Sequence, residues 1–390
     1  MYLKHKSITK KPQITMYLTM YLSKKLYFMV LSDRGRETER PLNRVLNLLM
    51  RTIFYNIIVL LFLLICGEII LGYWFTKDNF GIHMRKERNK NWKTVSNFNN
   101  VEYEFFYKRN FYGFRGEEFN PQDVKIIFEG GSTSNQRYTP EKLTIVGQLN
   151  NKFKNENINL KIYNAATDGK SLRGIIYDFN YWFKKINDFK PNFIILYLGI
   201  NERTLANQLD QIQYDFNFQR KKIDMLKDYF KNNSFFYSRY KIITNKYFPK
   251  QTSGYFLDYK KLYSNFKYTN YAEAKKLKRN IIDEDKKIID QLEKRLLILK
   301  QIFEFNKIKP IIITQVEFNG LNNKKLFLVN EKLKKFSIKN NFAIIKLDEI
   351  IKMEVNDFYD KVHTTPKGSK KIADTIYPFL KNILIAEVKK

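Results

Sequence analysis

The stretch VKIIFEGGS, residues 124–132, decides the fold, because an apolar run of strand length ends there in two glycines and a serine. Continuous Ile-rich runs are typical of strands that are buried on both faces of a parallel sheet. Helical patterns separate the runs, and this alternation predicts a doubly wound parallel α/β sheet. The four later runs are LKIYNA (160–165), FIILYLG (193–199), PIIIT (310–314) and FAIIKL (342–347).

Cap residues and helical spacing mark the intervening helices. Thr139 with Pro140 predicts one helix start, and Thr365 with Pro366 predicts the start of the last helix. Apolar residues that recur on one face predict the buried side of each helix. These residues are Leu143, Val146, Leu149 and Phe153, then Ile288, Leu292, Leu296, Leu299 and Phe303, and finally Ile372, Ile376, Leu380 and Leu384.

Composition excludes several classes of protein. A content of 44% hydrophobic and 16% aromatic residues excludes a disordered chain. The net charge of +31 comes from lysines spread over nearly every segment. We therefore expect no nucleic-acid binding and instead expect attraction to anionic lipid or acidic glycan. Cys66 is the only cysteine and the chain has three histidines, so we expect no disulfide, no metal site and no cofactor.

Residues 53–75, IFYNIIVLLFLLICGEIILGYWF, have the length and composition of one transmembrane helix. A buried core helix is the alternative, although core helices are usually shorter and have a polar face. Basic residues flank the run on both sides and do not decide its orientation. Because a long segment translocates largely regardless of charge, we expect residues 1–52 to be a cytoplasmic tail and the rest to be periplasmic or extracytoplasmic.

The remainder of the chain divides into a lead-in segment, residues 76–123, and a catalytic domain, residues 124–390. The lead-in is polar and aromatic without a clean period. Within the domain, residues 202–280 interrupt the alternation and are rich in Tyr, Phe and Lys. This insertion is too long for an ordinary loop, so it predicts either a lid over the substrate or a helical side layer.

Three separate segments carry residues for acyl-transfer chemistry. Ser132 follows a strand, and the glycines before it let the chain turn and expose the hydroxyl. His363 is the only histidine after residue 83, and Asp360 can fold back within a turn to accept its Nδ1 hydrogen. Asn201 follows another strand and can donate to an oxyanion. The alternatives for these residues taken one by one are a strand-to-helix turn at Ser132, a helix-capping Asp360 with a surface His363, and a turn residue at Asn201.

The same segments resemble the sequence blocks of the SGNH (GDSL-like) hydrolase superfamily. GGS at 130–132, NAATDG at 164–169, GIN at 199–201 and DKVH at 360–363 occur in the family's order. GFRG at 113–116 resembles the membrane-anchored bacterial members. The resemblance implies a flavodoxin-like sandwich and an oxyanion hole made by Ser132, Gly169 and Asn201. It also implies that Asp360 orients His363.

Two residues depart from the family pattern. Gly131 stands where the family usually has Asp before the serine, and Glu202 stands where it usually has Asp after Asn201. Glu202 would alter a hydrogen bond that supports its block, but neither departure removes a catalytic atom.

Three functions remain open from the sequence. The first is a membrane-anchored serine esterase that removes an acyl group from a carbohydrate or lipid. The second is an O-acyltransferase that forms the same acyl-enzyme and passes the acyl group to a cell-surface glycan, which would depend on exclusion of water. The third is a membrane-tethered binding module without catalysis, which the intact Ser132, Asp360 and His363 set argues against.

Overall fold

The computed structural model describes residues 40–75, 87–98, 100–204, 222–252 and 266–388. Contacts divide the chain into two compact units, Met1–Gly67 and Glu68–Lys390. The first 39 residues of the expected cytoplasmic tail lie outside the described residues.

Helix α2, Arg40–Leu71, carries the apolar run. Its segment Val45–Leu71 has a mean hydropathy of 2.5, is not buried inside the protein, and is long and apolar enough to cross a membrane. The predicted bounds of 53–75 were wrong at both ends, because helical backbone begins earlier and ends at Leu71. Tyr73 and Trp74 therefore follow the helix and are not part of it.

The larger sheet is parallel and has five strands in the order β4-β3-β5-β7-β8 within the described residues. Its strands are β3 (Ile126–Gly130), β4 (Ile162–Asn164), β5 (Phe193–Leu198), β7 (Lys309–Thr314) and β8 (Ala343–Ile345). All residues of β3 and β5 are buried. The five predicted strands and the doubly wound α/β fold are confirmed.

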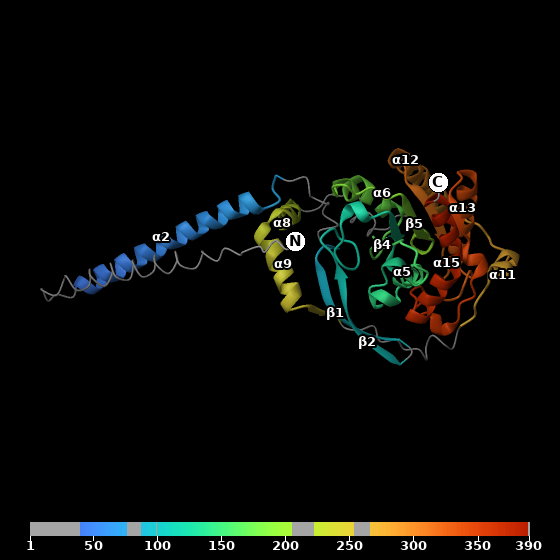
Figure 1. The fold of residues 1–390 in the computed structure, drawn as a ribbon, viewed down its shortest axis with the longest axis horizontal. Coiled ribbons are helices and arrows are strands. Elements are labelled where there is room, and N and C mark those ends of the chain that lie inside the picture. Colours follow the sequence, from blue (N-terminus) through green and yellow to red (C-terminus); the bar gives the residue numbers. More distant parts are fainter. Residues whose placement is uncertain (1–39, 76–86, 99, 205–221, 253–265, 389–390) are drawn as a thin grey trace, which may run out of the picture. The chain divides into compact units, whose positions relative to one another are not determined.

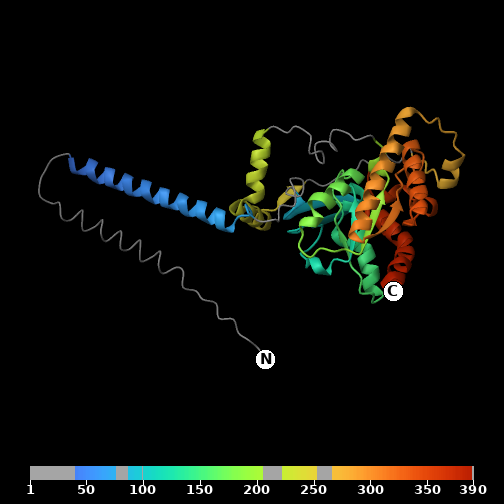
Figure 2. The same ribbon diagram turned by 90° about the horizontal axis from the view of Figure 1, so that it is seen from above.

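Helices cover both faces of this sheet (Figure 1). Helices α6 (Leu172–Tyr181), α12 (Asp283–Asn306) and α13 (Lys324–Lys339) pack with strand residues such as Ile127 and Ile194. On the other face, α5 (Ile145–Asn155) and α15 (Pro366–Val388) pack with residues such as Phe128 and Ile195. Figure 2 shows the same layers after a quarter turn.

The predicted buried faces of α12 and α15 are confirmed, and α15 begins at Pro366 as expected. The predicted start of α5 was wrong. A 3-10 turn, Glu141–Leu143, follows Pro140, and α5 is capped instead by Thr144, whose Oγ1 accepts the Gly147 N–H at 3.0 Å. Thr139 is buried, and its carbonyl accepts a hydrogen bond from Arg115. It therefore stabilises the loop before α5 and does not cap the helix. Of the predicted face, Val146, Leu149 and Phe153 are buried, whereas Leu143 lies in the 3-10 turn.

A second, smaller sheet with the order β2-β1-β6 lies in a part of the chain where the sequence shows no regular period. Strand β1 (Lys90–Phe98) pairs antiparallel with β2 (Val101–Arg109) and parallel with β6 (Lys250–Thr252). Its buried positions include Thr94 and Ser96, and those of β2 include Arg109. Polar residues therefore face inward, which hides the alternation expected of a strand.

The predicted insertion contains two consecutive helices, α8 (Lys222–Asn233) and α9 (Phe235–Tyr247), followed by β6. Residues 205–221 and 253–265 lie outside the described residues, so the choice between lid and side layer stays a prediction. The remaining short elements are η1 (Pro121–Asp123), α4 (Ser132–Asn135), η3 (Phe183–Lys185), η4 (Ile200–Glu202), α11 (Tyr271–Lys276), α14 (Leu347–Ile350) and η5 (Val355–Asp357).

Candidate active site

The carboxyl ends of three neighbouring strands bring the predicted residues together. Ser132 begins α4 directly after β3, Gly169 lies in the loop after β4, and Asn201 lies in η4 after β5. Ligands in open α/β sheets bind at this edge. His363 reaches the same place from the loop that leads into α15.

Ser132, His363 and Asp360 form a continuous hydrogen-bonded chain. The His363 Nε2 atom lies 2.7 Å from Ser132 Oγ, and His363 Nδ1 lies 2.7 Å from Asp360 Oδ2. Because the Asp360 carboxylate accepts the Nδ1 hydrogen, Nε2 is left as the acceptor that faces the serine hydroxyl. Nucleophile, base and orienting carboxylate thus have the geometry required for serine activation.

The loop that carries His363 is fixed from several directions. Asp360 Oδ1 accepts the backbone N–H groups of Val362 at 2.8 Å and of His363 at 2.7 Å. Burial alone would raise the pKa of Asp360, but the hydrogen bonds and the nearby imidazole lower it below the usual value. The Tyr359 ring stacks on His363 with centroids 5.5 Å apart and also contacts Phe98 of β1. Asp360 is therefore held as a carboxylate, and the imidazole plane is fixed.

The three predicted oxyanion donors lie in segments that follow neighbouring strands. Within the part of the chain that the structure describes, the backbone N–H groups of Ser132 and Gly169 have no acceptor. The Asn201 side-chain amide donates one hydrogen to the Lys170 carbonyl at 2.8 Å, which leaves its second hydrogen available. Gly169 adopts φ +75°, a conformation that favours glycine. This set of donors can hold a developing oxyanion.

Gly131, the first departure from the family pattern, has a structural reason. A Cβ at this position would overlap the Asn201 amide nitrogen and approach the Lys170 carbonyl to 3.1 Å. The Asn201 amide therefore occupies the space that a side chain at position 131 would need. Glycine at this position allows the Asn201 amide, the predicted oxyanion donor, to lie against the turn that carries Ser132.

Glu202, the second departure, is buried and supports the loop after β5. Its Oε1 accepts the Leu172 N–H at 2.7 Å at the start of α6, and its Oε2 lies 3.5 Å from Arg295 Nη1. The carboxylate thereby joins η4 to α6 and α12. Both of these contacts link structural elements, as expected for the supporting role predicted for Glu202.

Sequence reasoning missed a buried ionic cluster beneath the site. The Lys170 ammonium lies 2.9 Å from Glu129 Oε2, forms an ion pair with Asp178 and donates to the Ala165 carbonyl at 2.9 Å. Burial raises the pKa of Glu129 to about 8 although Lys170 opposes the shift, and burial raises the pKa of Asp178 to about 6. Lys170 also supplies the carbonyl that accepts a hydrogen bond from Asn201, so the cluster positions the predicted oxyanion donor. The sequence feature that could have indicated this cluster is Glu129, a charged residue near the end of the otherwise apolar strand β3.

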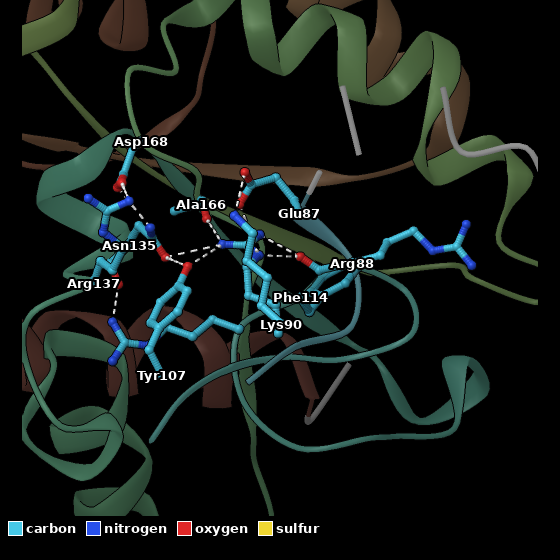
Figure 3. A network of polar contacts seen from close by, with 12 residues as sticks. Glu87, Arg88, Lys90, Tyr107, Phe114, Asn135, Arg137, Ala166 and Asp168 are labelled. Carbon is cyan, nitrogen blue, oxygen red and sulfur yellow. Dashed lines mark hydrogen bonds and ion pairs between the residues drawn. The ribbon is translucent and has the colours of Figure 1, made fainter. Parts of the chain in front are cut away.

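A second missed network surrounds Asn135, three residues after the nucleophile. Asn135 Oδ1 accepts the Tyr107 hydroxyl at 3.0 Å and Arg109 Nη1 at 3.1 Å, and Asn135 Nδ2 donates to Asp168 at 2.8 Å. Figure 3 shows Tyr107, Asn135 and Asp168 converging in this network. Arg109 also donates to the Ala166 carbonyl at 2.8 Å. The small sheet thus fixes both the nucleophile turn and the loop that carries Gly169.

Arg115 of the GFRG segment holds the chain immediately after the nucleophile helix. Its buried guanidinium donates to the carbonyls of Asn135, Gln136 and Thr139 and pairs with Glu141 Oε2 at 2.6 Å. Three carbonyls of one loop are therefore satisfied by a single side chain.

Gln136 joins the nucleophile loop to the histidine loop. Its side-chain amide donates to Thr364 Oγ1 at 3.0 Å and to Ser369 Oγ at 2.5 Å, and its carbonyl oxygen accepts the Ile145 N–H. The residue adopts φ +49° to make these contacts. Among the described residues, no cluster of His, Cys, Asp and Glu is arranged to hold a metal ion. The expectation that the chain uses no cofactor stays a prediction.

Comparison with known proteins gives structural likeness only. No family model and no curated protein matches the sequence. The structure resembles that of TesA, with 11% identity, a TM-score of 0.39 and coverage of 66% of this chain and 98% of that one. It also resembles the lipase/acylhydrolase from Enterococcus faecalis, with 12% identity, a TM-score of 0.37 and coverage of 66% and 96%.

A third similar structure is a member of the lipolytic protein G-D-S-L family from Veillonella parvula. It is 14% identical, has a TM-score of 0.34 and covers 65% of this chain and 97% of that one. The Enterococcus faecalis and Veillonella parvula proteins are named as lipolytic proteins, but identities and TM-scores this low carry no functional conclusion. We therefore infer the function from the geometry of the site.

Proposed function

We propose that this chain is a membrane-anchored serine esterase of the SGNH (GDSL-like) type that removes an ester-linked acyl group through an acyl-enzyme. The observation that carries the proposal is the hydrogen-bonded chain from Ser132 through His363 to Asp360, with 2.7 Å at each step. A strand-to-helix turn and a helix cap would not require these three side chains to be aligned.

Acylation begins when Ser132 Oγ attacks the ester carbonyl carbon and His363 Nε2 accepts the hydroxyl proton. Asp360 stabilises the imidazolium through the Nδ1 hydrogen bond. The carbonyl oxygen gains negative charge and is held by the N–H groups of Ser132 and Gly169 and the Asn201 amide. The imidazolium then protonates the leaving alkoxide, and the acyl group remains on Ser132.

Deacylation reverses the roles with water as the nucleophile. The His363 side chain is 23% exposed, so bulk water can reach the base in this structure. An acyltransferase would instead have to exclude water from its acyl-enzyme so that a glycan hydroxyl takes the acyl group.

The apolar segment Val45–Leu71 supports anchoring of the enzyme by one transmembrane helix. We place the catalytic domain in the periplasm or outside the cell, where acylated carbohydrates and lipids of the cell surface are its substrates. The strongly positive net charge would attract such anionic surfaces.

The test uses the full-length chain in detergent or nanodiscs. A fluorophosphonate probe should label Ser132, and peptide mass spectrometry should locate the adduct; the Ser132→Ala variant should remain unlabelled. Aryl acetate and acetylated glycans should release free acetate, whereas transfer to an added glycan would indicate the acyltransferase. A folded wild-type chain that is neither labelled nor acylated would refute the proposal.

A further inference from the structure

We propose that helices α8 and α9 lie in the headgroup region of an anionic lipid bilayer, with one face of α9 in contact with lipid. This inference rests on the proposed membrane anchor but not on the esterase activity. The lipid-contacting face consists of Phe236, Tyr240, Ile243 and Tyr247 and is called the α9 lipid face below.

The spacing of these four residues places them on one side of α9. They recur at i, i+4, i+7 and i+11, which is the repeat of a single helical face. All four side chains are exposed, with 64% exposure at both Tyr240 and Tyr247. Two tyrosines with a phenylalanine and an isoleucine match the amphipathic aromatic residues that favour the membrane–water interface.

The opposite side of α9 forms hydrogen bonds with the rest of the protein. The Lys241 ammonium donates to the Arg88 carbonyl at 2.6 Å, and the Asn245 amide donates to the Asn89 carbonyl at 2.5 Å. Asn91 of β1 returns a hydrogen bond to the Asn245 carbonyl at 3.1 Å. The polar face of α9 is therefore fixed to the small sheet, and the apolar face is turned away from it.

The junction between α8 and α9 is attached to the residues at which the membrane span ends. Glu68, in the last turn of α2, accepts the N–H groups of Phe235 at 2.7 Å and Phe236 at 3.2 Å. The Tyr73 N–H donates to the Asn233 carbonyl at 2.7 Å. A carboxylate at the start of α9 also interacts favourably with the helix dipole. These bonds give Glu68, the one acidic residue in the apolar run, a role at the bilayer surface.

Aromatic packing extends this attachment. The Trp74 ring contacts Tyr229 and Phe230 of α8 with centroids 5.6 and 5.4 Å apart, and Trp74 Nε1 donates to Glu68 at 3.3 Å. Phe230 remains 53% exposed in spite of this contact. A span that ends at Leu71 leaves Trp74 at headgroup depth, so α8, which packs on Trp74, and the start of α9, which is bonded to Glu68, are at a similar depth.

The basic residues of α9 indicate that the lipid surface it contacts is anionic. The sequence of α9, FFYSRYKIITNKY, contains three basic residues and no acidic residue. Arg239 and Lys246 are exposed and lie beside the α9 lipid face in the helical repeat. Basic residues next to exposed aromatic residues are typical of helices that lie in the plane of an anionic membrane.

The test measures membrane depth in the full-length chain reconstituted in phosphatidylcholine–phosphatidylglycerol vesicles. Cys66, the only cysteine, is first changed to Ser, and single cysteines are then introduced and labelled with a small fluorophore. Tyr240→Cys reports the α9 lipid face, and Leu60→Cys reports the span. Ile338→Cys is the matched control, because Ile338 of α13 is an equally exposed apolar residue, at 63%.

We expect lipids with a nitroxide near the headgroup to quench the label at Tyr240 several-fold more than the label at Ile338. Aqueous iodide should give the opposite order. Omission of phosphatidylglycerol, or the double change Arg239→Gln and Lys246→Gln, should weaken lipid quenching at Tyr240 and leave deep-nitroxide quenching at Leu60 unchanged.

Other outcomes overturn the inference and distinguish it from the anchor. If Leu60 is quenched but Tyr240 behaves like Ile338, the anchor stands and α9 does not contact lipid. If Tyr240 is protected from iodide without lipid quenching, another protein segment covers the face. If Leu60 is not quenched, both the anchor and this inference fail, whatever the esterase activity.

Discussion

Changing Gly131 to Ala should displace an oxyanion donor without a large loss of stability. The added methyl group would overlap the Asn201 amide nitrogen. The backbone at Gly131, with φ −89° and ψ −152°, is extended and accepts an alanine. The end of the Asn201 side chain can rotate away, and the cost is its hydrogen bond to the Lys170 carbonyl.

The size of the effect follows from how far the amide must move. An ordinary contact with the new methyl group begins at 3.4 Å, so the nitrogen must move by well over an ångström. A misplacement of about 1 Å can cost roughly 100-fold in rate, and loss of one oxyanion donor costs about 3 kcal/mol. We therefore expect acylation to slow by roughly 100-fold or more, with substrate binding nearly unchanged.

The assay is single-turnover acylation by an aryl ester, measured with the melting temperature of each variant. The comparison set is wild type, Gly131→Ala, Asn201→Ala and the double variant. Because both changes remove the same donor, the double variant should be about as slow as either single variant.

Three results would refute this reasoning. Near-normal acylation by Gly131→Ala would mean that the Asn201 amide does not contribute where the structure places it. If the rate losses of the two single variants multiply in the double variant, the methyl group acts on a group other than Asn201, such as the Ser132 N–H. A variant that is destabilised but fully active per folded molecule would remove Asn201 from the site.

Three further predictions concern other parts of the site. Ser132→Ala and His363→Ala should each lower turnover by several orders of magnitude, and the double variant should be hardly slower, as measured by steady-state esterase assays. The folded protein holds the Glu129 proton more tightly than the unfolded chain does, so stability should fall as pH rises from about 4.5 to about 8. Glu129→Gln should make the melting temperature fall less steeply across this pH range. A pH dependence that is unchanged in the variant would contradict titration of Glu129 as its cause. Glu202→Gln should lower the melting temperature by a few degrees but leave acylation within a few-fold of wild type, since Glu202 supports η4 without reaching the substrate.

The larger sheet could be predicted because each strand is a continuous apolar run and each run ends in a turn. Because such strands are buried on both faces, they can be recognised in the sequence without knowledge of their neighbours. The Ser132, Asn201 and His363 segments were recognisable for the same reason, since they follow or precede regular elements at defined positions. Their convergence follows from the parallel arrangement, which gathers the strand ends at one edge.

The smaller sheet could not be predicted, because its inward-facing positions include Thr94, Ser96 and Arg109. Thr94 and Ser96 are polar, and Arg109 is buried through its hydrogen bonds to Gly113, Asn135 and Ala166, so the inward side of β1 has no apolar period and that of β2 ends in a charged residue. The same holds for the Lys170, Glu129 and Asp178 cluster. A charged residue is expected at the surface unless its partners are known, and here the partners come from separate elements.

The link from Gln136 to Thr364 and Ser369 has a consequence for the order in which the protein matures. Ser132 and His363 are separated by 231 positions, and the contact between them requires α15 to pack on the same sheet face as α5. During synthesis, the nucleophile turn leaves the ribosome long before the histidine loop does. In the proposed mechanism, the chain therefore emerges without its base and gains it only when the last helix docks, so Ser132 stays unactivated until folding of the domain is complete.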